Sequence, residues 1–196
     1  MLRQGMMLLA LLGVCVGTAH AERPFLNRLQ RVMLEDGQVI VSPQKPTDDS
    51  GVAALAVGLV EAPIDKVWPV LRDCQHHKHF MPKAYESAIT QRFSPTQYIC
   101  YLKASTPFPL PDLYYHALST IKQLGAGWQL SWTLSKGNYK RYDGRWEAWP
   151  YDGQRTLLVY AIDVDPDLKM PDALLRNGWL DALPDVFKAV RRRCGA

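Results

Sequence analysis

The pattern of apolar residues near the end of the chain predicts a long amphipathic helix. Between residues 171 and 193, apolar side chains recur every three or four positions, as they do along one face of an α-helix, at Leu175, Trp179, Ala182, Leu183, Val186, Phe187 and Val190. Pro171 suits a first helical turn, whereas Pro184 is expected to kink the helix or divide it into two pieces. A helix of this kind needs an apolar surface to lie on.

Alternation of apolar and polar residues before that helix predicts a series of strands. It is clearest at 128–134, where Trp128, Leu130, Trp132 and Leu134 share one face. Further strands are expected at 38–41, 52–61, 85–93, 97–105, 113–122, 145–151 and 156–164, several of them joined by turn sequences such as Asp152-Gly153. The proline-bearing stretch 106–112 and the charged stretch 137–142 are expected to be loops.

Two short helical segments complete the expected order of elements. Residues 24–33 carry Phe25, Leu29 and Val32 on one side, and a second helix from Ile64 buries Val67, Trp68 and Leu71. This order predicts an α+β fold, in which a curved antiparallel sheet grips a long C-terminal helix, with short helices after the first core strand. We expect residues 22–50 to form an arm with a short strand and a loop, and residues 51–196 to form the domain.

The first 21 residues have the features of a secretory signal peptide. Arg3 precedes an apolar run at 6–16, and Ala19-His20-Ala21 provides a small-residue cleavage signal. The run is too short to span a membrane. A lipid anchor on Cys15 is the alternative, but Val14 stands where that signal requires a small residue. We expect cleavage after Ala21 and a secreted, periplasmic protein.

Charge and cysteine content restrict the possible partners and the disulfide pairing only slightly. The formal net charge is +4 and falls to +3 when Arg3 is lost with the leader, which argues neither for nor against nucleic acid. No basic–aromatic interleaving suits nucleic acid, however, and no glycine-rich phosphate loop occurs, so no nucleic-acid partner is expected. Cys74, Cys100 and Cys194 remain after cleavage and allow one disulfide. Cys74 with Cys100 is favoured because Cys194 lies near the chain's end.

Residues 73–79, Asp-Cys-Gln-His-His-Lys-His, offer side chains that bind zinc or copper. Their spacing matches no known motif, and Lys78 would repel a cation, so we expect a solvated helix end and no metal. No Gly-x-Ser-x-Gly sequence occurs and no cysteine has an identifiable partner histidine, so no catalytic residue and no cofactor are assigned. Acid–base chemistry stays open, with His116, Glu147 and Asp163 as candidates, although each is expected on the outer face of a strand.

Several short stretches, taken in order, resemble a known superfamily. They are 60–63 (Val-Glu-Ala-Pro), 67–73, 80–82, 144–147, 156–160, and Asp165-Pro166 followed by Pro171 and Leu183-Pro184. Together they resemble the START-like domains, also described as the polyketide-cyclase or coenzyme-Q-binding-protein superfamily, which share the helix-grip fold of the birch pollen allergen. The resemblance implies a cavity between sheet and helix that holds a lipid, quinone or other apolar molecule. A cofactor-independent cyclase or dehydratase using the same pocket is the alternative, and an enzyme is less favoured than a carrier. A protein-interaction module whose cavity is closed is the third possibility.

Inward-facing aromatic and apolar residues are the candidate ligand contacts in such a cavity. Small residues, Ala54, Ala56, Gly58 and Gly178, are expected to leave a void opposite them. The expected ligand-binding residues are Phe80, Tyr101, Tyr114, Trp128, Trp132, Trp146, Tyr160, Leu175, Trp179 and Leu183. His116 is a further polar candidate, and the loop 106–111 is expected to edge the cavity mouth. The expected partners are a hydrophobic small molecule and, transiently, a membrane, with the protein a monomer.

Overall fold

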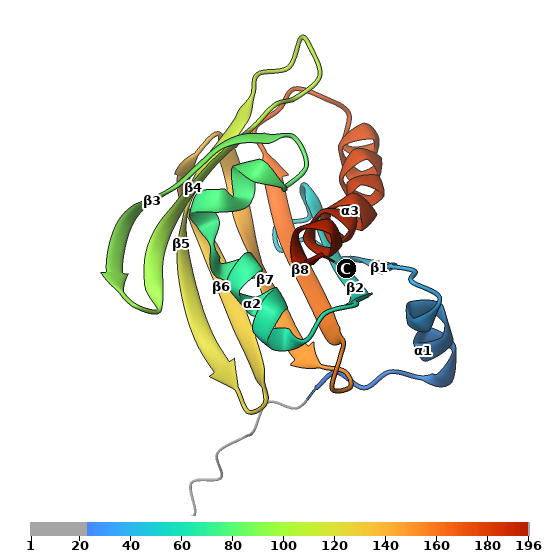
Figure 1. Ribbon diagram of the computed structural model, residues 1–196. Coiled ribbons are helices and arrows are strands. Elements are labelled where there is room, and N and C mark those ends of the chain that lie inside the picture. Colours follow the sequence, from blue (N-terminus) through green and yellow to red (C-terminus); the bar gives the residue numbers. More distant parts are fainter. Residues whose placement is uncertain (1–22, 196) are drawn as a thin grey trace, which may run out of the picture.

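The eight strands form one antiparallel sheet in the order β1-β2-β8-β7-β6-β5-β4-β3 (Figure 1). The computed structural model describes residues 23–195, so the expected signal peptide and Cys15 lie outside the described residues. Strands β3 to β8 follow one another as hairpins, and β2 pairs with β8 to bring the two ends of the chain together. The strands are β1 (Ile40–Gln44), β2 (Val52–Val60), β3 (Ala84–Ser94), β4 (Gln97–Ala104), β5 (Leu113–Leu124), β6 (Gly127–Gly137), β7 (Tyr139–Pro150) and β8 (Thr156–Pro166).

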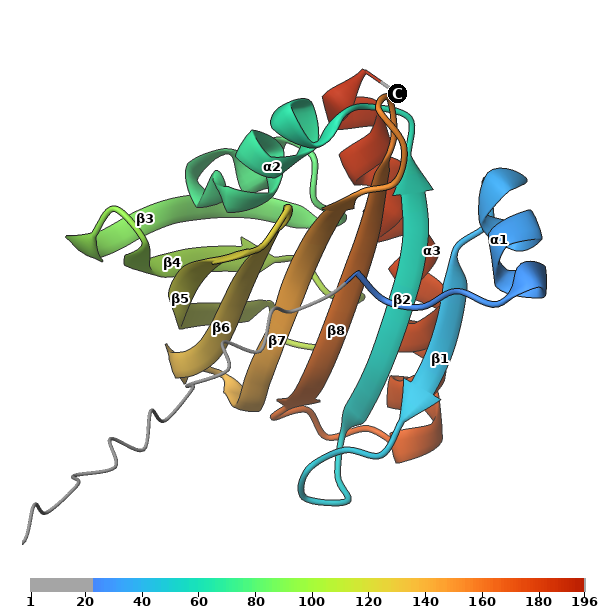
Figure 2. The ribbon, with the colours of Figure 1, turned by 90° about the horizontal axis from the view of Figure 1, so that it is seen from below.

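Three helical elements cover one face of the sheet, which we call the inner face (Figure 1). They are α2 (Ile64–Arg72), the 3₁₀ helix η1 (Cys74–His79) and α3 (Asp172–Cys194). A fourth helix, α1 (Arg28–Glu35), lies beside β1 at the edge of the sheet (Figure 2). In residues 23–195 no helix is long and apolar enough to cross a membrane. The α+β architecture with a sheet gripping a C-terminal helix is therefore confirmed.

Alternation along the strands divides the buried residues between the two faces. Ala54, Ala56 and Val60 of β2 belong to the inner cluster, which also contains Leu183, Phe187 and Val190 of α3. The residues between them face outward, where a smaller cluster gathers Leu26, Leu34, Leu59, Trp149 and Leu157 beneath α1. Strands β2, β7 and β8 thus contribute buried residues to both hydrophobic clusters, because successive side chains point to opposite faces.

Helix α3 has the expected position, and its buried face is concentrated in its second half. It begins after Pro171 and ends at Gly195, which adopts the left-handed conformation (φ 71°) that favours glycine. Pro184 does not divide it. The buried residues are Leu175, Leu183, Phe187, Ala189 and Val190, whereas Trp179, Ala182 and Val186 are only half-buried.

One sequence-based expectation about local structure is wrong, and another is confirmed only in part. Residues 137–142 are not a loop, because β7 begins at Tyr139 and buries Arg141 and Tyr142. Residues 73–79 are a solvated helix end only in part, because η1 buries Cys74 and His77 and exposes most of its other side chains. In both stretches charged or polar residues lower the local hydropathy, while their burial depends on partners distant in the sequence.

The N-terminal helix also differs from its expected form. It starts at Arg28, where the Asn27 side chain accepts a hydrogen bond from the Gln30 backbone N–H and the Gln30 side chain accepts one from the Asn27 N–H. The expected apolar side is exposed, with Phe25 at 87% of its full exposure. Leu26 and Leu34 are the residues that α1 and its lead-in bury instead.

Candidate functional site

A wall of aromatic rings lines the inner face of β5 to β8. The rings of Trp146 and Tyr160 stack with centroids 3.9 Å apart, and those of Tyr115 and Tyr142 stack at the same distance. Trp132 lies between these two pairs, with its centroid 5.9 Å from Tyr160 and 6.3 Å from Tyr142. Such offset contacts stabilise aromatic clusters beyond the area they bury.

The wall encloses a cavity of about 30 Å³. That is close to the volume of one water molecule and about a tenth of the smallest usual ligand pocket. The residues lining it are His77, Met81, Tyr98, Cys100, Tyr115, Ala117, Ser119, Leu130, Trp132, Tyr142, Trp146 and Tyr160. In this conformation the large aromatic side chains fill most of the space between sheet and helices.

The small residues of β2 do not create the void expected from the sequence. A Cβ atom at Gly58 would lie 2.6 Å from Cδ1 of Phe187, so the ring of Phe187 already occupies that space. Gly178 has open space beside it but faces solvent on the exposed half of α3. The small side chains therefore allow α3 to approach the sheet closely, and the approach removes the hollow.

Glycine has a different role at Gly144, which is paired with Trp132 in the register of β6 and β7. A Cβ at Gly144 would lie 2.5 Å from Cζ2 of Trp132. The indole therefore lies directly against the bare backbone of Gly144, and it lines the cavity. Its Nε1–H is buried without a hydrogen-bond partner. A buried donor of this kind is costly unless another group accepts from it.

The groups around the cavity are neutral. Burial lowers the pKa of His77 to about 4, and its Nε2 lies 3.1 Å from the backbone carbonyl of Leu71, so this nitrogen carries the proton and donates it. Burial likewise raises the pKa of Tyr115 to about 12, and raises the pKa of Tyr142 and Tyr160. None of the described lining residues is Lys, Arg, Asp or Glu.

Cys74 and Cys100 form the disulfide that the sequence favoured, and it joins η1 to β4 beside the cavity. Their sulfurs and a ring nitrogen of His77 all lie within 4.8 Å of one another, which is the spacing of a metal site. The two sulfurs are bonded to each other, however, and so offer no thiolate to a metal. Cys194 is the free cysteine among the described residues.

The structure places three of the ten expected ligand-binding residues, Trp132, Trp146 and Tyr160, in the lining of the cavity. Phe80, Trp128, Leu175, Trp179 and Leu183 belong to the same hydrophobic cluster or pack against it without lining the cavity. Trp128, for example, stacks on Trp68 of α2 at 5.4 Å between centroids. These five residues therefore build the walls and the cover of the site.

Tyr101 and Tyr114 lie on the outer face, which contradicts their expected place in the cavity. The Tyr101 hydroxyl donates to Glu86, and its ring lies 4.8 Å from that of His116, which faces outward too. The neighbouring residues Tyr98 and Tyr115 line the cavity instead. Alternation could not choose between Tyr114 and Tyr115, since a slip of one residue exchanges the faces.

Sequence reasoning missed Tyr98, Tyr115, Tyr142 and His77 as lining residues. One signal could have found Tyr98. If Cys100 bonds to Cys74 in the core, Cys100 faces inward, and so does Tyr98 two positions before it. Tyr142 was hidden by the charged residues Lys140, Arg141 and Asp143, which made this part of β7 look like a loop.

The acid–base candidates of the sequence lie elsewhere. Asp163 accepts hydrogen bonds from Arg141 and Thr47, and Glu147 pairs with Arg145 at 2.7 Å. Neither carboxylate lines the cavity, and His116 faces outward as well. The residues that were candidates for catalysis are therefore part of the polar outer face of the sheet.

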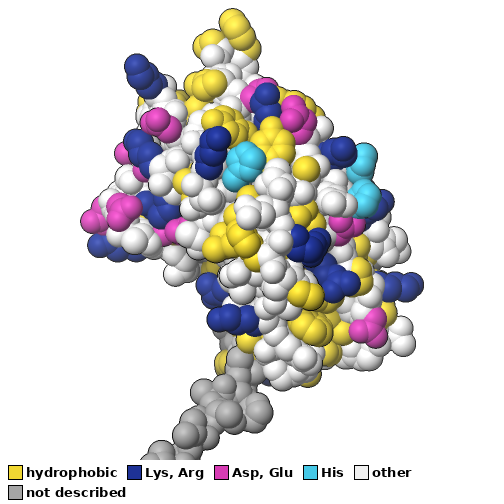
Figure 3. Space-filling model, turned by 90° about the vertical axis from the view of Figure 1, so that its left-hand side faces the viewer, with side chains coloured by type: hydrophobic (Ala, Val, Ile, Leu, Met, Phe, Trp, Pro, Cys, Tyr) yellow, Lys and Arg dark blue, Asp and Glu magenta, His cyan; other side chains and the backbone are white. Residues whose placement is uncertain are grey.

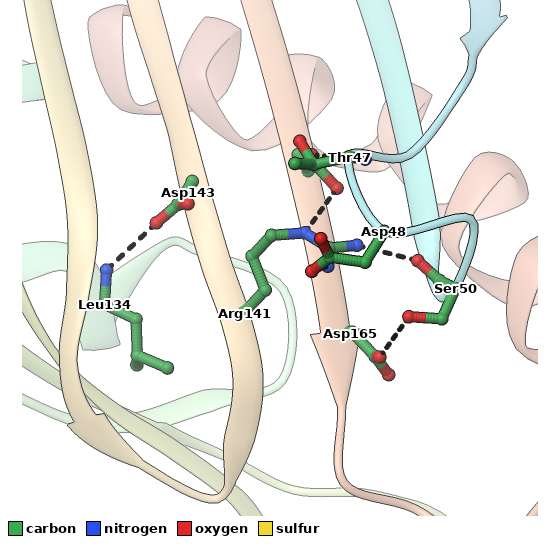
Figure 4. Close-up of polar contacts among 8 residues, drawn as sticks. Thr47, Asp48, Ser50, Leu134, Arg141, Asp143 and Asp165 are labelled. Carbon is green, nitrogen blue, oxygen red and sulfur yellow. Dashed lines mark hydrogen bonds and ion pairs between the residues drawn. The ribbon is translucent and has the colours of Figure 1, made fainter.

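The contacts of Arg141 fasten the loop between β1 and β2 to the sheet (Figure 4). Its Nε donates to Asp163 at 2.7 Å, its Nη1 to Asp48 at 2.7 Å and its Nη2 to the Ser50 carbonyl at 2.7 Å. Ser50 also donates to Asp165, at 2.8 Å. This network explains how a guanidinium can be buried in β7, because each of its three nitrogens donates a hydrogen bond.

A larger hollow, of about 530 Å³, is an open groove across the outer face of the sheet. Its lining includes Lys45, Asp143, Arg145 and Asp163. Charges of both signs make this groove a poor match for an apolar molecule, which would leave them unsolvated. The smaller aromatic cavity is therefore the better candidate site for such a ligand.

Comparisons with known proteins agree with the architecture. A family model described as "Polyketide cyclase / dehydrase and lipid transport" matches residues 60–190. A search of curated proteins found no significant match. Among solved structures, a STAR-related lipid transfer protein from Xanthomonas axonopodis superposes with a TM-score of 0.71 at 20% identity, covering 81% of this chain and 94% of that one.

Two further solved structures share the fold. Human STARD10 superposes with a TM-score of 0.70 at 16% identity, over 80% of this chain and 69% of that chain. A START superfamily protein from Mycobacterium smegmatis gives 0.60 at 17% identity, over 73% and 97% of the two chains. At these identities the likeness concerns the fold, so the site must be argued from this chain's own residues.

Proposed function

Because the chain belongs to the polyketide cyclase/dehydrase and lipid transport family, we propose that it binds and carries a hydrophobic small molecule between its sheet and α3. The observation that carries the proposal is the uncharged aromatic wall, with Trp132, Trp146 and Tyr160 around a buried cavity. Most ligand pockets are apolar and contain a few well-placed polar groups. Two proteins of similar structure, a STAR-related lipid transfer protein and a START superfamily protein, support the same function.

Uptake of a ligand requires the site to open, and the first half of α3 is the part that can move. Between residues 172 and 182 only Leu175 is buried, whereas Leu183, Phe187 and Val190 anchor the second half. Pro184 lies between the halves and cannot donate a backbone hydrogen bond to Leu180. Leu175 belongs to the inner hydrophobic cluster and Trp179 packs against it, so displacing both residues would open this cluster to a ligand.

The protein is proposed to work outside the cytoplasm. The N-terminal sequence supports this, and so does the Cys74–Cys100 disulfide, since such bonds persist in oxidising compartments.

Transient contact with a membrane is proposed at the loop between β4 and β5. Phe108 is 96% exposed there, and apolar side chains gather at this tip (Figure 3). Sedimentation with lipid vesicles should therefore be weaker for Phe108→Ser than for the unaltered protein, and equal sedimentation would refute the contact.

Catalysis in the same cavity is the second candidate function. The observation that favours it is that a buried histidine, His77, lines the cavity. Its pKa of about 4 makes it a weak base at neutral pH, where a general base works best with a pKa near 7. Carriage is therefore favoured. Turnover of a polyketide-like substrate that is abolished by His77→Gln would reverse this preference.

Native mass spectrometry and dye titration test the proposal of a carrier. Protein purified from its own source should retain an apolar molecule, and an apolar fluorophore should bind the delipidated protein with micromolar affinity. Trp179→Ala should change that affinity, because Trp179 packs against the cluster, whereas Leu174→Ala should not, because Leu174 is 61% exposed on the same half of α3. Absence of both retained ligand and dye binding would refute the function.

A further inference from the structure

The unpartnered indole of Trp132 indicates what kind of group the cavity receives. Its side chain is more than nine-tenths buried, and its Nε1–H has no acceptor among the described residues. The ring is held in place by the bare backbone of Gly144 and by the neighbouring rings of Tyr142 and Tyr160. A buried donor without a partner is satisfied by an acceptor that reaches it, and the cavity that Trp132 lines is a place where such an acceptor can enter.

The other polar groups around the cavity restrict the charge of its occupant. Tyr115, Tyr142 and Tyr160 present hydroxyls that stay protonated at neutral pH, because burial raises their pKa values. His77 is neutral for the same physical reason. With no charged residue among the described lining residues, a carboxylate or an ammonium group would lose its hydration without gaining an ion pair.

The size of the cavity restricts the occupant further. A volume of about 30 Å³ admits one oxygen-bearing group and not a whole apolar molecule. The remainder of a ligand must lie in the space that opens when the first half of α3 moves. The cavity then serves as a polar subsite at the inner end of a larger apolar one.

We propose that this subsite accepts the carbonyl oxygen of a neutral apolar ligand, a ketone or an ester, which receives a hydrogen bond from Trp132 Nε1–H. The inference rests on the proposed function and adds the chemical class of the ligand. It excludes free fatty acids and amines as preferred ligands because of their charge, and plain hydrocarbons because they offer no acceptor. A molecule that satisfies the indole stabilises the complex relative to one that leaves it unpaired.

Competition against a bound apolar fluorophore tests the class. The probes are a long-chain methyl ketone, the methyl ester of a fatty acid, the free fatty acid at pH 8 and an alkane of equal length. The ketone and ester should displace the dye at concentrations about tenfold lower than the other two, as one buried hydrogen bond allows. Trp132→Phe keeps an aromatic ring, although a smaller one, and removes the donor. It should therefore bring the displacing concentrations of the ketone and ester level with that of the alkane, whatever its effect on the affinity for the dye itself.

The outcomes separate the two proposals. If dye and alkane bind but the ester has no advantage, or if Trp132→Phe retains the ester's advantage, the subsite proposal fails and the carrier function stands. If nothing binds, both fail. Should Trp132→Phe not fold, the indole N–H signal of ¹⁵N-tryptophan-labelled unaltered protein decides the matter. It should move downfield with the ketone and not with the alkane, and equal spectra would overturn the proposal.

Discussion

The ring of Phe187 in α3 lies directly on the backbone of Gly58 in β2. A Cβ atom at Gly58 would be 2.6 Å from Cδ1 and 2.8 Å from Cε1 of that ring, which is closer than real carbon contacts allow. The contact joins the buried half of the helix to the centre of the inner cluster. It therefore sets the distance between the two layers of the fold.

Gly58→Ala is expected to destabilise the protein by about 1–3 kcal/mol, because the added methyl forces Phe187 or the helix to shift. Urea unfolding measured by circular dichroism gives this value. Gly178→Ala is the matched control, since nothing lies within 4 Å of its added Cβ, and helix propensity favours Ala by up to about 1 kcal/mol. Equal stabilities of Gly58→Ala and the unaltered protein would show that α3 is not held at this distance.

The order of elements could be predicted from the sequence because it depends on local patterns. The alternation of Trp128, Leu130, Trp132 and Leu134 corresponds to β6, and the helical spacing after Pro171 corresponds to α3. Both signals arise from one face of an element being buried, which the chain records at intervals of two or of three to four residues. The fold class follows from these elements and their order.

The cavity could be predicted only in part, because its size and lining depend on contacts distant in sequence. Gly58 was expected to leave room, but Phe187, which lies far along the chain, fills it. Arg141 looked like a loop residue until Asp48 and Asp163 were seen to pair with it. Whether Tyr115 faces the cavity or the outer side of the sheet depends on the register of its strand. The sequence alone leaves that register uncertain by one residue, and a shift of one residue exchanges the two faces.

Arg141→Met should cost about 3 kcal/mol of stability, because Asp163 and Asp48 lose their partner while the Ser50 carbonyl loses a donor. Arg145→Met provides the control on the same strand. That arginine is half exposed and, in the part of the chain that the structure describes, pairs with Glu147 alone, so its loss should cost less than about 1 kcal/mol. Similar losses for the two variants in urea unfolding would contradict the role of Arg141 in fastening the β1–β2 loop.

The effect of Arg141→Met should also depend on pH. Burial acts to raise the pKa of Asp163, but hydrogen bonds from Thr47 and Arg141 outweigh it and hold the pKa below its ordinary value. A carboxylate with a lowered pKa stabilises the fold above about pH 4 and loses that contribution on acidification. The difference in unfolding free energy between the variant and the unaltered protein should therefore shrink below pH 4. A difference that stays constant to pH 3 would contradict this.

Removing the disulfide should destabilise the protein by about 3 kcal/mol. Cys74 and Cys100 are 26 residues apart. A cross-link that closes a loop of this length lowers the conformational entropy of the unfolded chain, which stabilises the folded state by about 3 kcal/mol. Cys74→Ser with Cys100→Ser, compared with Cys194→Ser, isolates the effect, since Cys194 is unbonded. If the unaltered protein has the same midpoint of unfolding in its reduced and oxidised states, the disulfide does not stabilise the fold and the prediction is wrong.

Pro184→Ala should slow the uptake of an apolar dye if the first half of α3 is the moving part. Alanine restores a backbone N–H that can bond to the Leu180 carbonyl, and one such hydrogen bond, worth about 1 kcal/mol, corresponds to about fivefold in rate. Pro171→Ala is the control, because Pro171 precedes the first turn, where no helical bond is restored. Stopped-flow fluorescence measures both, and equal rates would place the opening elsewhere.

His77 should make stability fall as the pH decreases from about 6.5 to 4. Its ring is neutral in the folded protein, where burial lowers its pKa to about 4, but it becomes protonated near pH 6.5 in the unfolded chain. Because the unfolded state binds more protons in this range, acidification favours unfolding, and the loss of stability amounts to roughly 3 kcal/mol between pH 6.5 and 4.

His77→Gln retains a donor for the Leu71 carbonyl but does not titrate, so its urea midpoint should vary less over this range. His79→Gln is the control because His79 is exposed, and it should keep the full dependence. If His77→Gln and the unaltered protein respond equally to pH, the neutral state of His77, and with it the uncharged character of the cavity, would have to be abandoned.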